Sequence, residues 1–177
     1  MQGQILTPWL YRRWAFDFPA ELYPAVIERL RGLPARADEL ARPLAPKDLN
    51  RSTGGAWSIQ RHLGHIADLE SLLTHRLDAY ERGDPLLPPA DMQNEASVNA
   101  NHDEQPIADV LARLRTRRET TIARLESYPR DFFARSAWHE RLGIQKRVVD
   151  SCVFFADHDD HHMALIQMLR REQFSQS

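Results

Sequence analysis

The chain has 177 residues and a formal net charge of −2, which is long enough for one domain with a hydrophobic core and short for two. Its near-neutral balance creates no overall field to attract nucleic acid or a membrane surface, so we expect neither as a partner. One cysteine, Cys152, excludes an internal disulfide and any site built from several cysteines. No apolar run reaches the roughly 20 residues of a membrane span, and the first residues lack the pattern of a signal peptide. We therefore expect a single cytoplasmic domain over residues 1–177.

Helical periodicity dominates the first half of the chain, and signals for strands are nearly absent. The first predicted helix covers residues 19–40, and Pro34 should bend or end it because proline removes a helix hydrogen bond. The proline- and glycine-containing residues 43–56 predict a connector. A second helix should begin after Ser58, whose hydroxyl can accept a free backbone N–H, and end near Gly83.

The second half of the chain predicts two more long helices. Residues 85–106 form a proline-containing segment of a length that is unusual in a compact domain and often functional. The third helix is predicted over residues 107–128 and is closed by Pro129. An irregular crossover over residues 130–145 then leads to the fourth helix, residues 146–172. Four helices of about this length predict an all-α four-helix bundle.

Two histidines of the fourth helix are the strongest candidates for chemistry. His158 and His162 are four residues apart, so they lie one turn above each other on the same helix face. Both fall within the apolar stripe, whereas His161 falls at its edge. Buried imidazoles need partners, because an unpaired polar group in a core costs about 1–3 kcal/mol. A divalent metal would satisfy both at once, and separate carbonyls or carboxylates are the alternative.

A third histidine from another helix would give such an ion three protein ligands and leave a position free for water or substrate. The second helix offers His62 and His65. Periodicity mildly favours His62, which lies closer to the centre of the apolar stripe. If Ser58 is the N-cap, however, His62 occupies the position that packs against Trp57 in a hydrophobic staple. His65 lies one turn deeper and could reach a neighbouring helix, so the spacing leaves both open.

Two stretches resemble signatures of one known family. The residues Trp57-Ser-Ile-Gln-Arg-His-Leu-Gly-His65 resemble the helix-two signature of the DinB/YfiT-like family, and residues 156–167 resemble its helix-four signature, His-x-x-His-His. The resemblance implies a four-helix bundle, usually a homodimer, that binds nickel, zinc or another divalent ion. Its three ligating histidines match His65, His158 and His162. Some relatives are transferases or isomerases that use a low-molecular-weight thiol. His62 is an additional histidine beside the expected ligand.

Other polar residues have less distinctive positions. Asp68 and Asp159 could accept the second N–H of a ligating imidazole, although a solvated carboxylate is the more common role. His139 is a candidate for the mouth of the site, while His75 and His102 are expected at the surface.

One basic run and the lone cysteine are expected to have only structural roles. The arginine run from Arg113 to Arg118 is interspersed with acidic residues and has no aromatic platform, so we expect a solvated helix face rather than a nucleic-acid surface. Cys152 points away from the histidine face and is expected to be a packing residue.

These observations predict a metal-dependent enzyme acting on a small molecule. An ion with an open position lowers the pKa of a bound water or thiol and so supplies a nucleophile at neutral pH. Thiol transfer and hydrolysis are the two predicted reaction types, with zinc or nickel as the ion because both suit imidazole ligands. A metal-binding or stress-associated bundle without turnover, and a structural bundle without metal, are the alternatives.

Overall fold

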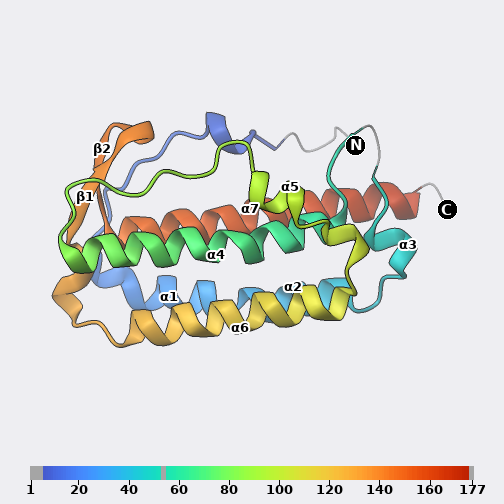
Figure 1. Cartoon of the computed structure of the whole chain (residues 1–177), viewed down its shortest axis with the longest axis horizontal. Helices are drawn as coiled ribbons and strands as arrows, with labels where there is room; N and C mark the ends of the chain where they lie inside the picture. Colours follow the sequence, from blue (N-terminus) through green and yellow to red (C-terminus); the bar gives the residue numbers. More distant parts are fainter. Residues whose placement is uncertain (1–5, 53–54, 176–177) are drawn as a thin grey trace.

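The computed structural model describes residues 6–52 and 55–175. Four helical rods form a bundle (Figure 1), which confirms the predicted all-α class. The first rod is broken in two, and the other three are continuous. The rods are α1 (Tyr23–Arg31) with α2 (Leu33–Ala41), α4 (Ile59–Arg82), α6 (Ile107–Glu126) and α7 (Val148–Ser175).

The connectivity of the bundle explains its long loop. Helix α4 packs against α6 and α7, and α1 packs against the same two helices. Following the colours of Figure 1, α4 and α6 run in the same direction, opposite to the first rod and α7. A short turn cannot join parallel neighbours, so residues 83–106 return along the bundle. This segment carries α5 (Glu95–Asn99) and the 3₁₀ turn η3 (His102–Glu104).

Local sequence signals set the ends of the helices. The Ser58 hydroxyl accepts the Arg61 backbone N–H at 3.0 Å and caps α4, as predicted. Gly83 ends the same helix with a φ of 72°, a conformation that glycine adopts without steric cost. The predicted helix over residues 19–40 is instead two helices that meet at Gly32. Pro34 lies in the first turn of α2, where its missing N–H breaks no helix hydrogen bond.

A small hairpin replaces the irregular crossover predicted over residues 130–145. Strands β1 (Ser136–His139) and β2 (Ile144–Arg147) pair antiparallel at one end of the bundle. Strands of this length are too short to show a clear alternation, which is why the sequence pattern did not reveal them. The Trp138 backbone exchanges hydrogen bonds with the segment after α4, accepting from Leu87 N and donating to the Pro85 carbonyl at 2.9 Å each.

Shorter elements complete the fold. They are η1 (Trp9–Tyr11), η2 (Ala20–Leu22), α3 (Pro46–Leu49), η4 (Arg130–Ala134) and η5 (Glu140–Leu142). Among the described residues, no helix combines the length and the apolar character needed to cross a membrane.

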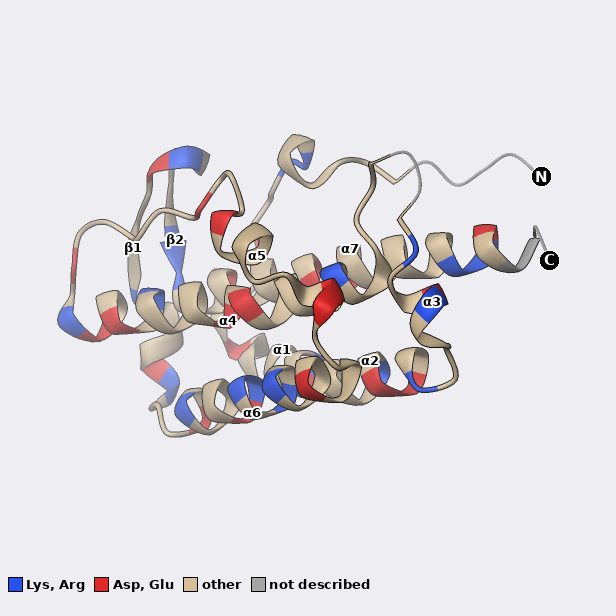
Figure 2. Ribbon diagram, turned by 45° about the vertical axis from the view of Figure 1, so that its right-hand side comes forward, with Lys and Arg blue, Asp and Glu red and all other residues tan. Residues whose placement is uncertain are grey.

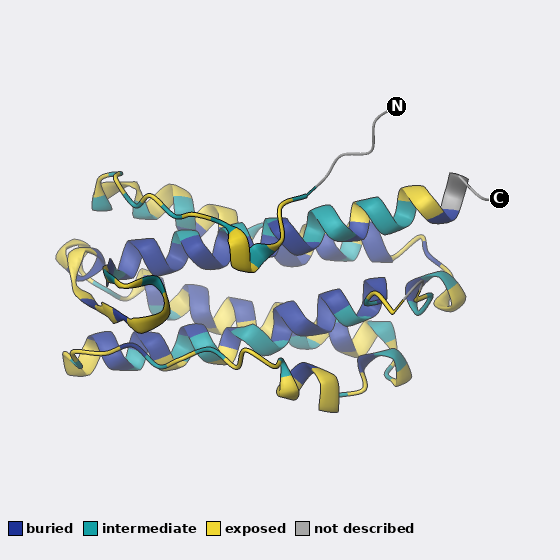
Figure 3. Ribbon diagram, turned by 90° about the horizontal axis from the view of Figure 1, so that it is seen from above, coloured by how far each residue is buried: buried dark blue, intermediate teal, exposed yellow. Residues whose placement is uncertain are grey.

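Each long helix turns a buried face toward the others and an exposed face outward (Figure 3). Near the hairpin the core includes Leu77, Phe133 and Phe155, and toward the other end it includes Leu63 and Leu114. Acidic and basic positions lie interspersed along the outer faces (Figure 2). Cys152 is a buried free thiol within this core, as expected for a packing residue.

One buried ion cluster links the helices. Arg118 of α6 is 1% exposed. Its Nε donates to Glu70 Oε1 of α4 at 2.6 Å, and its Nη1 donates to Asp159 Oδ2 of α7 at 2.8 Å. The same Nη1 donates to the Leu30 carbonyl of α1 at 3.0 Å, so one guanidinium of α6 contacts the three other rods. The expectation that the whole Arg113–Arg118 run is a solvated face is therefore wrong for Arg118. It points inward because two buried carboxylates neutralise it.

Replacing Arg118 by methionine should lower the free energy of unfolding by about 3–5 kcal/mol, because two carboxylates would stay buried without their cation. Urea denaturation followed by circular dichroism measures this change. Arg115 of the same helix is exposed, and Arg115→Met should change stability by less than about 0.5 kcal/mol. Equal effects of the two substitutions would contradict the structural role of Arg118.

Candidate metal centre

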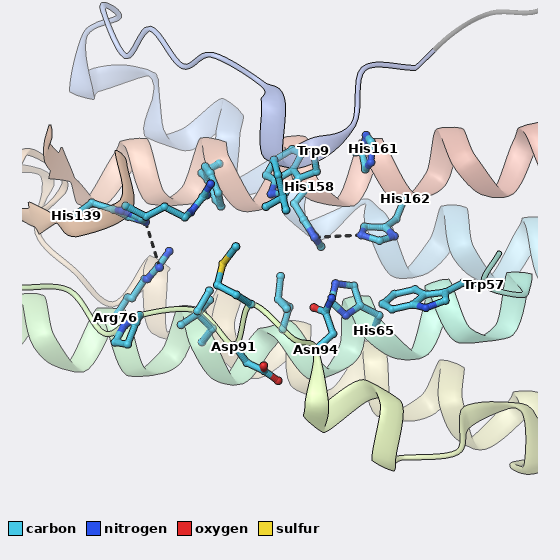
Figure 4. Close-up of a pocket in the computed structure, with 18 residues that line it drawn as sticks. Trp9, Trp57, His65, Arg76, Asp91, Asn94, His139, His158, His161 and His162 are labelled. Atoms are coloured by element: carbon cyan, nitrogen blue, oxygen red, sulfur yellow. Dashed lines mark hydrogen bonds between the residues drawn. The ribbon is translucent and has the colours of Figure 1, made fainter. Parts of the chain in front are cut away.

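Three histidines from two helices converge in the middle of the bundle. His65 lies on α4, and His158 and His162 lie on α7. One ring nitrogen from each of the three lies within 4.8 Å of the other two. All three side chains are buried, and the close-up shows them grouped at one end of a pocket (Figure 4). The structure thus brings together the three residues that the sequence singled out.

The geometry of the group fits a metal ion. The Nε2 atoms of His158 and His162 are 3.1 Å apart. Two nitrogens that each lie about 2.0–2.1 Å from one ion, at tetrahedral or octahedral angles, are about 2.9–3.4 Å apart. Three imidazoles are also a donor set that suits borderline ions such as zinc and nickel. The His158–His162 pair therefore already has the spacing of two ligands of one ion, and the nitrogen of His65 lies within 4.8 Å of both.

Burial keeps these imidazoles in the form that binds metals. Loss of solvent lowers the pKa of His65 to about 4. It also lowers the pKa values of His158 and His162 well below the ordinary range, and the neighbouring histidines add to this effect. A ligating imidazole must be neutral. The fold therefore presents three neutral ligands near pH 7 without the loss of a proton.

His62 supports the group from outside it. Its Nδ1 lies 2.8 Å from Nδ1 of His162. With Nε2 of His162 facing an ion, the proton of that ring lies on Nδ1, which donates to Nδ1 of His62. The rings of Trp57 and His62 are 5.5 Å apart, in accordance with the predicted staple contact. His62 is thus positioned to orient His162, while His65 supplies the nitrogen in the cluster.

The crossover segment orients His65. Nδ1 of His65 lies 3.0 Å from the Ser97 hydroxyl on α5, and that hydroxyl donates to Asp68 Oδ2 at 3.0 Å. His102 Nε2 lies 2.7 Å from the same carboxylate oxygen. Burial would raise the pKa of Asp68, but the hydrogen bonds from His102 and Ser97 outweigh it and lower the pKa. Asp68 therefore does not accept a hydrogen bond from His65 directly. Ser97 connects the two side chains, because its hydroxyl lies within hydrogen-bond distance of His65 and donates to Asp68.

The expectation that His102 is a surface residue is wrong. Its side chain is 1% exposed and lies against Gly64. A Cβ atom at Gly64 would come within 2.2 Å of the His102 ring, so only glycine allows this approach. His75 is exposed, as expected. No periodic signal marks Ser97 or His102, because both belong to short elements in the crossover.

A cavity of about 270 Å³ adjoins the three histidines. The ring of Trp9 lies edge-on to His158 and that of Trp57 edge-on to His65, with centroids 4.9 Å apart in both pairs. His161 lines the cavity beside these residues, consistent with its predicted position at the rim. At the other end the lining includes Arg76 and His139, with Arg141 close to both. His139 thus lines the cavity, but it is 5% exposed and is therefore buried in the wall.

Comparison with known families identifies the fold. Residues 29–166 match the family model of the DinB superfamily. The chain belongs to the DinB superfamily. The resemblance carried by the two histidine signatures is thereby confirmed. A comparison with curated proteins finds no match.

Two solved structures show the DinB fold again. YfiT from Bacillus subtilis, described as a probable metal-dependent hydrolase with an unusual four-helix bundle topology, superposes with a TM-score of 0.78 at 18% identity, covering 92% of this chain and 93% of that chain. The colibactin self-resistance protein ClbS, in complex with double-stranded DNA, superposes with a TM-score of 0.65 at 14% identity, covering 89% of this chain and 98% of that chain. At these identities the likeness establishes the fold.

The ClbS complex contradicts the expectation that nucleic acid is excluded as a partner. ClbS shares the DinB fold and was crystallised with double-stranded DNA. The expectation came from the net charge and from one arginine run. Net charge is a sum over the whole surface, and it does not describe the local surfaces that a fold can offer to DNA. The argument from composition was therefore wrong.

The pKa of His139 leads to a test of stability against pH. Burial, with help from Lys146 and Arg76, lowers this pKa to about 3, whereas an unfolded histidine titrates near 6.5. Below about pH 6.5 the unfolded state binds the proton and the folded state does not, so stability falls as the pH falls. Between pH 7 and pH 5 this residue should remove up to about 2 kcal/mol from the free energy of unfolding.

Urea denaturation at both pH values measures the loss. In His139→Gln, the loss of stability between pH 7 and pH 5 should be smaller by up to about 2 kcal/mol. His75→Gln, at an exposed position, should show the same loss as wild type. An identical loss in wild type and His139→Gln would show that His139 is not held neutral by the fold.

Proposed function

We propose that the chain binds one divalent ion, zinc or nickel, through His65, His158 and His162, and that it uses the ion to transform a small molecule in the adjoining cavity. The observation that carries the proposal is the convergence of three buried, neutral imidazoles at one end of that cavity. Membership of the DinB superfamily and the description of YfiT as a probable metal-dependent hydrolase support it.

A bound ion with an open position would lower the pKa of a coordinated water or thiol and would polarise the substrate group that is attacked. The chain itself orients the ligands. His62 Nδ1 accepts a hydrogen bond from Nδ1–H of His162, and the Ser97 hydroxyl oxygen accepts one from Nδ1–H of His65. Trp9 and Trp57 flank the rings and limit the access of water. Supporting contacts of this kind commonly affect metal affinity by about 10–100-fold.

Hydrolysis is the first reaction type that we propose, because the fold is shared with a probable metal-dependent hydrolase. Transfer of a low-molecular-weight thiol is the second. The same free position could take a thiolate, and the family signatures resemble those of thiol-dependent transferases. The apolar walls of the cavity suit the body of a small organic substrate in both reactions.

Substitution of the ligands provides the first test. Elemental analysis of the untagged protein should find about one ion per chain, and His65→Ala, His158→Ala or His162→Ala should reduce it to background. His62→Ala should keep one ion at saturation but weaken its binding by about 10–100-fold. His75→Ala is the matched control and should bind like wild type. Loss of the ion in His62→Ala together with retention in His65→Ala would reverse the assignment.

A reaction panel provides the second test. Wild-type protein should catalyse turnover of at least one member of a panel of esters, amides and thiol–electrophile pairs. Removal of the ion by a chelator should abolish the activity, and the ion should restore it, because the nucleophile depends on the metal. Dependence on added thiol distinguishes transfer from hydrolysis. Full metal occupancy with no turnover across the panel would favour the alternative of a non-catalytic metal-binding bundle.

A further inference from the structure

The end of the cavity opposite the histidines is lined by two arginines, Arg76 and Arg141. Arg76 of α4 is 1% exposed and lines the cavity. Its Nε donates to the Pro88 carbonyl and its Nη2 lies 3.2 Å from His139 Nε2, but its Nη1 is buried with no hydrogen-bond partner in the described part of the chain. Arg141 is exposed and lines the same end. Within residues 6–52 and 55–175, neither arginine forms an ion pair with a carboxylate.

Helix geometry directs Arg76 toward the histidines. Arg76 follows His65 by eleven residues, which is three turns plus about 20°, so both lie on the same face of α4 about 16 Å apart along the axis. Side chains of a helix lean toward its N-terminus, and this brings the guanidinium back along the cavity. Figure 4 shows Arg76 and His139 at one end of the pocket and the three histidines at the other.

The middle of the cavity is apolar. Leu69 and Leu72, one and two turns after His65 on α4, line one side, and Phe154 of α7 lines the other. Asp91 also lines the cavity, but its two carboxylate oxygens accept the backbone N–H groups of Gln93 and Ala96. Within the described residues Asp91 forms no ion pair with Arg76, and its carboxylate is held by the backbone at the start of α5.

Arg76 is the buried charge at this end. The Lys146 side chain is also fully buried, 3.8 Å from the centroid of the Phe154 ring and without a hydrogen-bond partner among the described residues, but burial and the nearby Arg76 lower its pKa well below the ordinary range, which favours the neutral amine. Burial is the main reason that the pKa of Arg76 falls, to about 10, and Arg141 lowers it further. A buried cation without a counter-ion is costly, so an anion at this end of the cavity would be strongly favoured.

We propose that Arg76 and Arg141 form a carboxylate-binding subsite, and that the substrate of this protein is a small organic acid. Its carboxylate would contact Nη1 of Arg76, its apolar body would lie along Leu69, Leu72 and Phe154, and its reacting group would face the three histidines. A guanidinium suits a carboxylate in charge, and the two N–H groups of the unpaired Nη1 of Arg76 are available to donate to its oxygens. This substrate class rests on the proposed function.

Binding of octanoate and its uncharged analogue octanamide tests the subsite. Tryptophan fluorescence is the readout, because Trp9 and Trp57 line the cavity. The zinc-loaded full-length chain should bind octanoate at least tenfold more tightly than octanamide. Arg76→Gln should reduce this preference to within twofold, and Arg141→Gln should weaken it several-fold. Arg115→Gln, an exposed position on α6, is the matched control and should retain the preference.

Two further measurements check that the variants fold and distinguish binding at the arginines from binding at the ion. Arg76 is buried, so its variant is checked by circular dichroism, and Arg141→Gln alone decides the outcome if Arg76→Gln does not fold. A carboxylate could also bind the zinc, so the same pair is measured with His158→Ala, which should lack the ion. The preference for octanoate should persist there.

Equal binding of octanoate and octanamide by wild type would overturn the proposal. So would a preference that disappears in His158→Ala but survives in both arginine variants, because the carboxylate would then be bound by the ion. Failure of wild type to take up either zinc or nickel would reject the proposed function alone. The octanoate preference of the metal-free chain would still decide the subsite.

Discussion

The burial of three imidazole rings between α4 and α7 is the constraint on which the rest of this structure depends. Polar rings in a helical core require partners, and each of these rings offers one nitrogen to the shared centre. Around this group the chain places His62 beside His162 and Ser97 beside His65. The buried Arg118 cluster joins the same two helices through Glu70 and Asp159, so the helix positions that the histidines need are held by charge pairs as well as by apolar contacts.

The parallel arrangement of α4 and α6 has a direct consequence for the site. The chain must pass along the length of the bundle between these helices, and the connecting segment lies over α4. Ser97 of this segment contacts His65. That segment supplies Ser97, and His102 close against Gly64. It also supplies part of the cavity wall, including Pro89 and Met92. A bundle with short antiparallel connections would present the same histidines without this support, and the His65 ring would have fewer contacts to orient it.

The cavity has a distinct chemical character at each end. Neutral imidazole nitrogens lie at one end, where burial keeps the pKa values of the histidines low. The buried guanidinium of Arg76 and the exposed Arg141 lie at the other, beside a neutral His139 that the hairpin contributes. Apolar side chains separate the two. Such a layout would orient a substrate in one direction only, because an acid group and a metal-reactive group could not exchange places without loss of contacts at both ends.

The sequence by itself determined the helical class, the serine cap of α4 and the pairing of His158 with His162, because all three follow from spacing along one helix. The two histidine signatures likewise pointed to the DinB fold. Tertiary structure decided that His65 rather than His62 joins the cluster, that Arg118 and His102 are buried, and that residues 136–147 form a hairpin. It also placed Arg76 in the same cavity as the histidines. Periodicity reports which face of a helix is apolar, but it carries no record of which distant segment that face will meet, and those contacts arise only when the rods pack.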